Sequence, residues 1–350
     1  MQYFLGSYLV SIIGVITAYL WAEHINTGSG LTAIFVVFIL AILEISLSFD
    51  NAVVNAMKLE KMSQVWRHRF LTWGIAIAVF GMRFLFPILV VSIFAKLSML
   101  EVTQIALKES DKYAHYLHLT HAPIVSFGGI FLLMLFLHYF FDEGKETHWI
   151  EPIEKSLCKL DTFRGIEIII ASVAILLTQN FMPTVEEKLS VVISGIFGII
   201  TYLGIDGISH YLERAEQKKI SNCAGNVACG GFVAFMYLEL IDASFSLDGV
   251  LGAFALSRDI VIITIGLAIG AMFVRSLTIM LVEKKTLAQF LYLEHGAHWA
   301  IGALAVIMLI STRVDVPEII TGLIGLVFIV CALVSSIIHN KKIENYNYKK

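Results

Sequence analysis

The sequence predicts an all-helical integral membrane protein with about ten transmembrane helices and an inverted internal repeat. Three observations lead to this prediction: an apolar composition, basic residues concentrated in every other loop, and three short motifs that each occur twice in the same order. The three are independent, because they concern residue content, loop charge and motif order.

The composition indicates a chain made mostly of membrane spans. Its 350 residues are 58% hydrophobic and only 15% charged, whereas a soluble domain has about 25% charged residues. Stretches long enough to cross a hydrocarbon core of about 30 Å fall near 3–21, 31–57, 70–95, 123–141, 165–181, 189–208, 229–256, 260–282, 298–311 and 318–338. We therefore expect the lipid bilayer as a partner and, without a basic patch, no nucleic acid.

Lysine and arginine test this number of spans. Seventeen of the 25 lie in the segments around 58–69, 142–164, 210–220, 283–286 and 341–350, and only six lie in the alternate loops. Basic loops face the cytoplasm, so we expect both termini to be cytoplasmic and the chain to be integral to the cell (inner) membrane. The remaining two, Arg83 and Arg275, fall inside predicted spans.

The repeat consists of three aligned pairs of segments. These are "EISLSFD" (44–50) with "DASFSLD" (242–248), "GIAIAVFGMR" (74–83) with "GLAIGAMFVR" (266–275), and "LTHAPIVSFG" (119–128) with "LEHGAHWAIG" (293–302). They predict a first half over 1–182, with core spans 31–141, and a second half over 183–350, with core spans 229–311. An odd number of spans in each repeat makes the halves inverted, the usual plan of alternating-access transporters.

Acidic residues inside the predicted spans indicate the chemistry. The motifs contain five acids (Glu44, Asp50, Glu239, Asp242 and Asp248) against Arg83 and Arg275. Carboxylates in a low dielectric do not all ionise without a counter-charge, so protons, a cation or both must neutralise the excess. Carboxylate, hydroxyl and amide oxygens suit manganese, magnesium or calcium better than zinc or copper.

These motifs predict a shared cation site at the interface of the halves. Its expected metal ligands are Glu44, Ser48, Asp50, Asn51, Glu239, Asp242, Ser246 and Asp248. Asp-Asn and Asp-Gly pairs favour a helix break near each motif aspartate. Arg83 and Arg275 would balance charge, or simply lock the bundle. His121 and His295 are candidates for gating or proton relay, or for ordinary interfacial hydrogen bonding.

The segments "LEISLSFDNAVV" and "ELIDASFSLDGVLGAFALS" resemble the TerC family, the tellurium-resistance-type membrane proteins of the LysE transporter superfamily. The resemblance covers roughly residues 35–140 and 230–310, so the chain looks like a longer branch. It implies manganese(II) export. One departure is Gly249, which stands where the first motif has Asn51.

The expected function is therefore transport of a divalent metal cation, manganese(II) first, by proton antiport. We expect no enzymatic activity and no permanently bound cofactor. An assembly or stress factor of the TerC type, without specific ion transport, is the alternative. An intramembrane aspartyl protease is disfavoured because the sequence contains no Gly-x-Gly-Asp motif. The sequence does not indicate an oligomeric state.

Overall fold

The computed structural model describes most of the chain. The described residues are 2–25, 27–142, 145, 147–159, 165–220, 234–236, 238–239, 242, 253, 256–257, 259–284, 290–314, 316 and 318–348. Within them all regular structure is helical and no strand occurs, as the sequence predicts.

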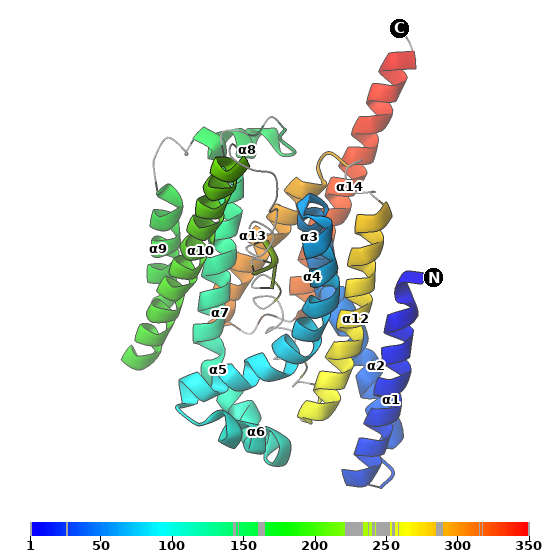
Figure 1. Cartoon of the computed structure of the whole chain (residues 1–350). Helices are drawn as coiled ribbons and strands as arrows, with labels where there is room; N and C mark the ends of the chain where they lie inside the picture. The colour runs from blue at the N-terminus through cyan, green and yellow to red at the C-terminus, as the bar shows by residue number, and fades with distance from the viewer. Residues whose placement is uncertain are drawn as a thin grey trace.

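The helices form a bundle whose long members run between two ends (Figure 1). In chain order they are η1 (Gln2–Phe4), α1 (Leu5–Ile25), α2 (Gly30–Leu47), α3 (Phe49–Lys61), α4 (Gln64–Ala76), η2 (Ile77–Leu85), α5 (Phe86–Ala95), α6 (Met99–Lys108), α7 (Ser110–Phe141), α8 (Glu151–Cys158), α9 (Ile166–Gln179), α10 (Val185–Ile220), α12 (Ile260–Lys284), α13 (Leu293–Ser311) and α14 (Glu318–Tyr348). The short helix α8 lies at one end, and α5 and α6 lie at the other.

Six helices of the described chain are long and apolar enough to cross a membrane. They cover Leu5–Ile25, Leu119–Phe141, Val185–Ile208, Ile260–Lys284, Leu293–Ser311 and Leu323–Lys341, and each coincides with one of the ten predicted spans. They identify an integral membrane protein.

The other four predicted spans differ from the expectation. The stretches 31–57, 70–95 and 165–181 contain only shorter apolar helices, Gly30–Ser46, Arg83–Ile93 and Ile166–Gln179. Two of these stretches are divided, the first at Ser48 and the second by a change of helix type in η2. Most of 229–256 lies outside the described residues.

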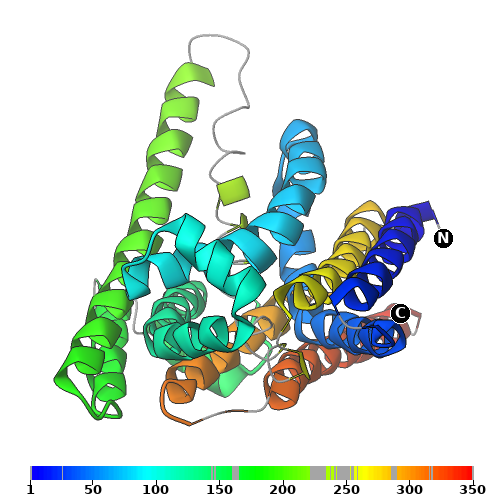
Figure 2. The same ribbon diagram turned by 90° about the horizontal axis from the view of Figure 1, so that it is seen from below.

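Central and outer helices differ in what their surfaces contact. In the apolar stretch of α7 that could cross the membrane, 78% of the residues are buried, whereas in that of α1 only 17% are buried. Large aliphatic side chains along α1, α9, α10 and α14 are exposed, for example Leu9, Val173, Ile196 and Val330. Apolar side chains that point outward along whole helices match a lipid environment. Figure 2 shows α1, α2 and α12 along one edge of the bundle.

Two glycines allow α12 to pack closely on α2. A Cβ on Gly266 would lie 2.6 Å from the Cβ of Leu40, and one on Gly270 would lie 2.5 Å from the Cβ of Glu44. Small residues four apart let helix backbones approach in membranes. The close approach places Glu44 directly against α12.

The polypeptide departs from α-helical geometry twice near the predicted site. Helix α2 ends at Leu47 and α3 begins at Phe49, with Ser48 at φ −102° and ψ 14° between them. The expected break in the first motif is therefore present. The nine residues of η2 form a π-helix that carries Arg83. Stretches of π-helix are rare and occur often at functional sites.

Candidate functional site

The candidate site begins with Glu44 in the last turn of α2. This side chain is 2% exposed. One carboxylate oxygen, Oε1, accepts a hydrogen bond of 2.7 Å from the Ser48 hydroxyl and another from Nη2 of Arg83. Ser48 lies one turn after Glu44, and its backbone N–H also bonds to the carbonyl of Glu44, at 2.9 Å. Glu44 is thus held by a residue of its own motif and by an arginine from η2.

Arg83 connects the two motifs. Its Nη2 is paired with Glu44, and its Nη1 lies 4.0 Å from Oδ2 of Asp242. Both Glu44 and Arg83 are buried, and Asp242 is nearly so. Residues almost 200 positions apart in the chain therefore lie within the span of one guanidinium group, which agrees with a site shared by the two motifs.

Arg275 of α12 lies in the same region beside Phe70 and Gly74 of α4. Its guanidinium group donates a hydrogen bond to the backbone carbonyl of Phe70 and lies 3.7 Å above the Phe70 ring. A Cβ on Gly74 would collide with both Arg275 and Glu239. The absence of a side chain at Gly74 therefore leaves room for both the Arg275 guanidinium group and the Glu239 carboxylate beside α4.

Two buried carboxylate oxygens of this cluster, Oε1 of Glu239 and Oδ2 of Asp242, have no hydrogen-bond donor. A buried polar atom without a partner is costly. A proton or a cation placed among these oxygens would remove that cost. Among the described residues, Glu44, Glu239 and Asp242 face Arg83 and Arg275, which is one acid in excess.

The described part of this cluster does not by itself form a metal site. Within that part no group of three or more His, Cys, Asp and Glu side chains is arranged to hold a metal ion. Asp50 and Asn51 lie in α3, but their side chains are outside the described residues, as are Ser246 and Asp248. Half of the predicted ligand set is therefore not placed.

A second buried acid, Glu154, lies on the short helix α8 at one end of the bundle. The side chain is 1% exposed. Its carboxylate accepts hydrogen bonds from the backbone N–H groups of Trp149 and Ile150, at 2.9 and 3.3 Å, and from Nδ1 of His295 and Nε1 of Trp299, at 2.9 and 3.0 Å. Burial raises the pKa of Glu154, but these hydrogen bonds outweigh it and hold the pKa at about 2.

The contact with Glu154 defines which ring nitrogen of His295 carries a hydrogen. An ionised carboxylate only accepts hydrogen bonds, so Nδ1 of His295 carries a hydrogen. Its Nε2 lies 3.3 Å from the hydroxyl of Thr147. Both ring nitrogens are therefore engaged by the segment that precedes and includes α8, and His295 attaches that segment to α13.

Lys145 lies close to the group formed by Glu154, His295 and Trp299. Its ammonium group lies 2.9 Å from the centre of the Tyr139 ring, which stacks on His298 at 3.5 Å. Nζ has no hydrogen-bond acceptor. Burial lowers the pKa of Lys145 to about 8, and the nearby Glu154 carboxylate offsets only part of this effect.

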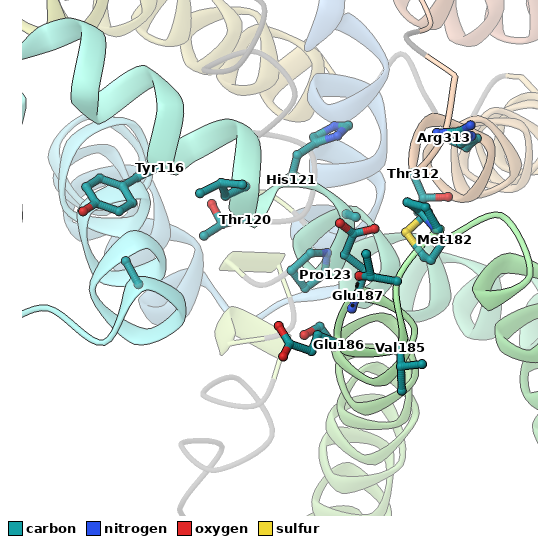
Figure 3. Close-up of a pocket in the computed structure, with 16 residues that line it drawn as sticks. Tyr116, Thr120, His121, Pro123, Met182, Val185, Glu186, Glu187, Thr312 and Arg313 are labelled. Atoms are coloured by element: carbon teal, nitrogen blue, oxygen red, sulfur yellow. Dashed lines mark hydrogen bonds between the residues drawn. The ribbon is translucent and has the colours of Figure 1, made fainter.

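The two predicted histidines lie apart. His121 of α7 lines an open pocket of about 940 Å³ at the α5 and α6 end of the bundle, with Glu186, Glu187 and Arg313 around it (Figure 3). His295 lies instead at the opposite end of the bundle, where it is hydrogen-bonded to Glu154 of α8. A direct proton exchange between the two histidines is therefore excluded.

Sequence reasoning missed the residues that surround His295. Glu154 lies in a loop segment without a repeat partner, and Trp299 was not considered. A signal was available in "HGAHW", where His295, His298 and Trp299 are spaced by three and four and thus share a helix face.

Comparison with known proteins gives one result. Residues 49–343 match the model of the family described as "Protein of unknown function (DUF475)", which is most of the chain, so the chain belongs to that family of membrane proteins. The expected membership of the TerC family is wrong, because short motif matches in apolar helices are weaker evidence than a match over nearly 300 residues. No curated protein and no solved structure matches the chain.

Proposed function

We propose that this member of the DUF475 family is a membrane transporter that carries a divalent cation in exchange for protons, and that the cluster of Glu44, Asp242 and Glu239 completes the cation site or carries the exchanged protons. The observation that carries the proposal is the pair of buried carboxylate oxygens, Oε1 of Glu239 and Oδ2 of Asp242, that have no hydrogen-bond donor. Intramembrane acids are rare and mark ion or proton pathways.

The position of the cluster supports transport over a purely structural role. Glu44 comes from α2, Arg83 from η2 and Arg275 from α12, and Asp242 belongs to the second copy of the same motif. A site built from both halves changes when the halves move relative to each other. An ion pair that only locks the bundle needs neither the excess acid nor carboxylate oxygens that lack a hydrogen-bond donor.

We also propose the inverted arrangement of the two halves with about ten crossings. The shorter helices Gly30–Ser46, Arg83–Ile93 and Ile166–Gln179 would complete the crossings, together with the segment around 229–256. Support comes from α7 and α13, which carry the two copies of the third motif and pack on each other: Gly129, the residue after the first copy, lies against Leu309, and Gly302, the last residue of the second copy, lies against Phe136. The concentration of basic residues in every other loop supports an orientation with both termini on the cytoplasmic side of the cell (inner) membrane.

The choice of cation follows from the donor atoms. Hard oxygen ligands favour manganese, magnesium and calcium, so manganese(II) remains the first cation to test. Export as the direction depended on the TerC resemblance and loses that support. Asp50 and Asp248, identical in both motifs, are the residues we propose as primary ligands, with Glu239 as the group that exchanges a proton.

Flux measurement tests the proposal. The purified full-length chain would be reconstituted in liposomes containing a pH-sensitive dye, and manganese, magnesium and calcium would be added in turn. We expect proton release that depends on one of these cations, abolished in Asp242→Asn and weakened in Glu239→Gln. Glu109→Gln is the matched control, because Glu109 is exposed and pairs only with Lys112 among the described side chains.

Two results would contradict the proposal. One is wild-type flux in the Asp242→Asn variant, which would make the cluster structural. The other is the absence of flux with any of the three cations from protein that elutes as a single folded species, which would favour the assembly-factor alternative.

A further inference from the structure

The junction of α4 and α12 contains a cavity that the transport proposal does not use. It has a volume of about 760 Å³ and lies between the first turns of α4 and the last turns of α12. Its lining residues are Gln64, Val65, Arg67, His68, Arg69, Ile279, Val282 and Glu283. Because the candidate span of α12 ends at Lys284, the cavity lies at the interface between bilayer and water.

The charge of this cavity favours an anion. Arg67, His68 and Arg69 line it, and Glu283 is the only acid among its lining residues. Glu283 accepts a hydrogen bond from the Tyr3 hydroxyl. Arg67 donates to the backbone carbonyls of Leu59 and Glu60, both at 3.0 Å, which holds it in place at the turn between α3 and α4.

The beginning of α4 adds to the positive potential. Ser63, at the N-cap, makes no side-chain hydrogen bond to the first turn, and that turn contains no acidic residue. The free N–H groups of a helix start attract anions. In this cavity they lie beside basic side chains.

The apolar surface below the cavity indicates that the anion belongs to a lipid. Val65, Arg69 and Trp73 are four residues apart and so follow one face of α4, and all three are exposed. Trp73 is 70% exposed and Phe80, further along in η2, is 68% exposed. Exposed aromatic rings below a basic cluster are typical of the bilayer interface, and basic pockets between helices bind anionic headgroups.

We propose that this cavity binds the headgroup phosphate of an anionic phospholipid, with the acyl chains along Trp73 and Phe80. Arg69 and His68 would contact the phosphate, and Arg67 would shape the site. This inference does not depend on the transport proposal, because the cavity lies at the surface of the bundle and shares no residue with the cluster of Glu44.

Lipid binding by the purified full-length chain tests the inference. Native mass spectrometry would count the lipids retained after addition of phosphatidylglycerol or phosphatidylcholine, and thermal unfolding would be followed with each lipid and with inorganic phosphate. We expect phosphatidylglycerol to be retained preferentially and to raise the unfolding temperature. Each of Arg69→Gln and His68→Gln should weaken its binding, by about fivefold for the arginine.

Arg313→Gln is the control, because Arg313 is an exposed arginine in the pocket around His121, at the end of the bundle formed by α5 and α6 (Figure 1). It should retain phosphatidylglycerol as the wild type does. Equal retention of both lipids, or unchanged binding in the Arg69→Gln and His68→Gln double variant, would overturn the inference. Stabilisation by inorganic phosphate equal to that by phosphatidylglycerol would overturn the assignment to a lipid and leave a free-anion site.

Discussion

Glu44 and Glu154 are buried to the same extent, yet the protein neutralises them differently. Glu44 is 2% exposed and faces the guanidinium group of Arg83, whereas Glu154 is 1% exposed and is surrounded by N–H donors from the backbone, His295 and Trp299. The donors around Glu154 satisfy both of its oxygens. Beside Glu44, the neighbouring Asp242 and Glu239 keep oxygens without donors.

The difference separates an acid that can exchange its partner from one that cannot. A fully hydrogen-bonded carboxylate gains nothing from a cation, because its desolvation is already compensated. A carboxylate cluster held by arginines with oxygens to spare can accept a proton or a metal ion. Burial alone therefore does not distinguish the two acids, whereas the carboxylate oxygens without donors beside Glu44 do.

The largest expected loss of stability comes from breaking the ion pair between Glu44 and Arg83. Glu44→Gln leaves Arg83 buried without its closest counter-charge, and breaking a buried pair costs about 3–5 kcal/mol. Adding Arg83→Met should recover much of that loss, because it removes the buried cation that Glu44→Gln leaves without its closest counter-charge. Thermal unfolding in detergent measures both. If Glu44→Gln were as stable as Glu109→Gln, the contrast between the two acids would have no energetic basis.

A smaller effect is expected from filling the space between helices. Gly74→Ala would place a methyl group against Arg275 and Glu239, and overpacking costs about 1–3 kcal/mol. Gly204→Ala on α10 is the control, because a Cβ there meets nothing within 4 Å. The control should be neutral or slightly stabilising. An equal outcome for both variants would show that α4 can move away from the cluster.

The contribution of Glu154 to folding stability should decrease in acid. Its folded-state pKa of about 2 is below the ordinary 4.5, so its stabilisation is present above pH 4.5 and is lost as the pH falls towards 2. Glu154→Gln should remove this part of the pH dependence and cost about 1–3 kcal/mol at neutral pH. The exposed Glu151→Gln on the same helix should change neither. Unfolding curves measured across this pH range distinguish the two variants. If Glu154→Gln lost as much stability below pH 4.5 as the wild type does, the assignment to Glu154 would be contradicted.

The smallest expected effect concerns Lys145. Its folded-state pKa of about 8 lies below the ordinary 10.5, so the unfolded chain binds more protons between these values and stability rises with pH in that window. Lys145→Met should remove this rise. Lys155→Met, an exposed lysine paired with Glu151, should preserve it. A Lys145→Met variant that kept the full rise would place the titration on another group.

The sequence predicts the polar centre of the fold better than its surroundings. Counting charges inside apolar spans predicted that Arg83 balances the motif acids, but not that its partner is Glu44. The expected helix break occurs at Ser48, two residues before Asp50, whereas the Asp-Asn pair on which the expectation rested lies within α3. The π-helical geometry of η2 could not be predicted, because an apolar segment reads the same in α and π form. Glu154 was missed because its partners come from α13 and from the local turn, a tertiary arrangement that no spacing in its own segment reveals.

The π-helix places Arg83 in a position that depends on hydrogen-bond register. Residues 77–85 bond five positions apart rather than four. If this segment changed to α-helical bonding, Arg83 would turn by about 100° for each residue of register it shifted. The turn would withdraw the guanidinium group from Glu44 and Asp242 together while the helix stayed intact. Deleting one residue from η2 would make the same change permanent, so the length of this segment, and not only its composition, determines where the positive charge lies.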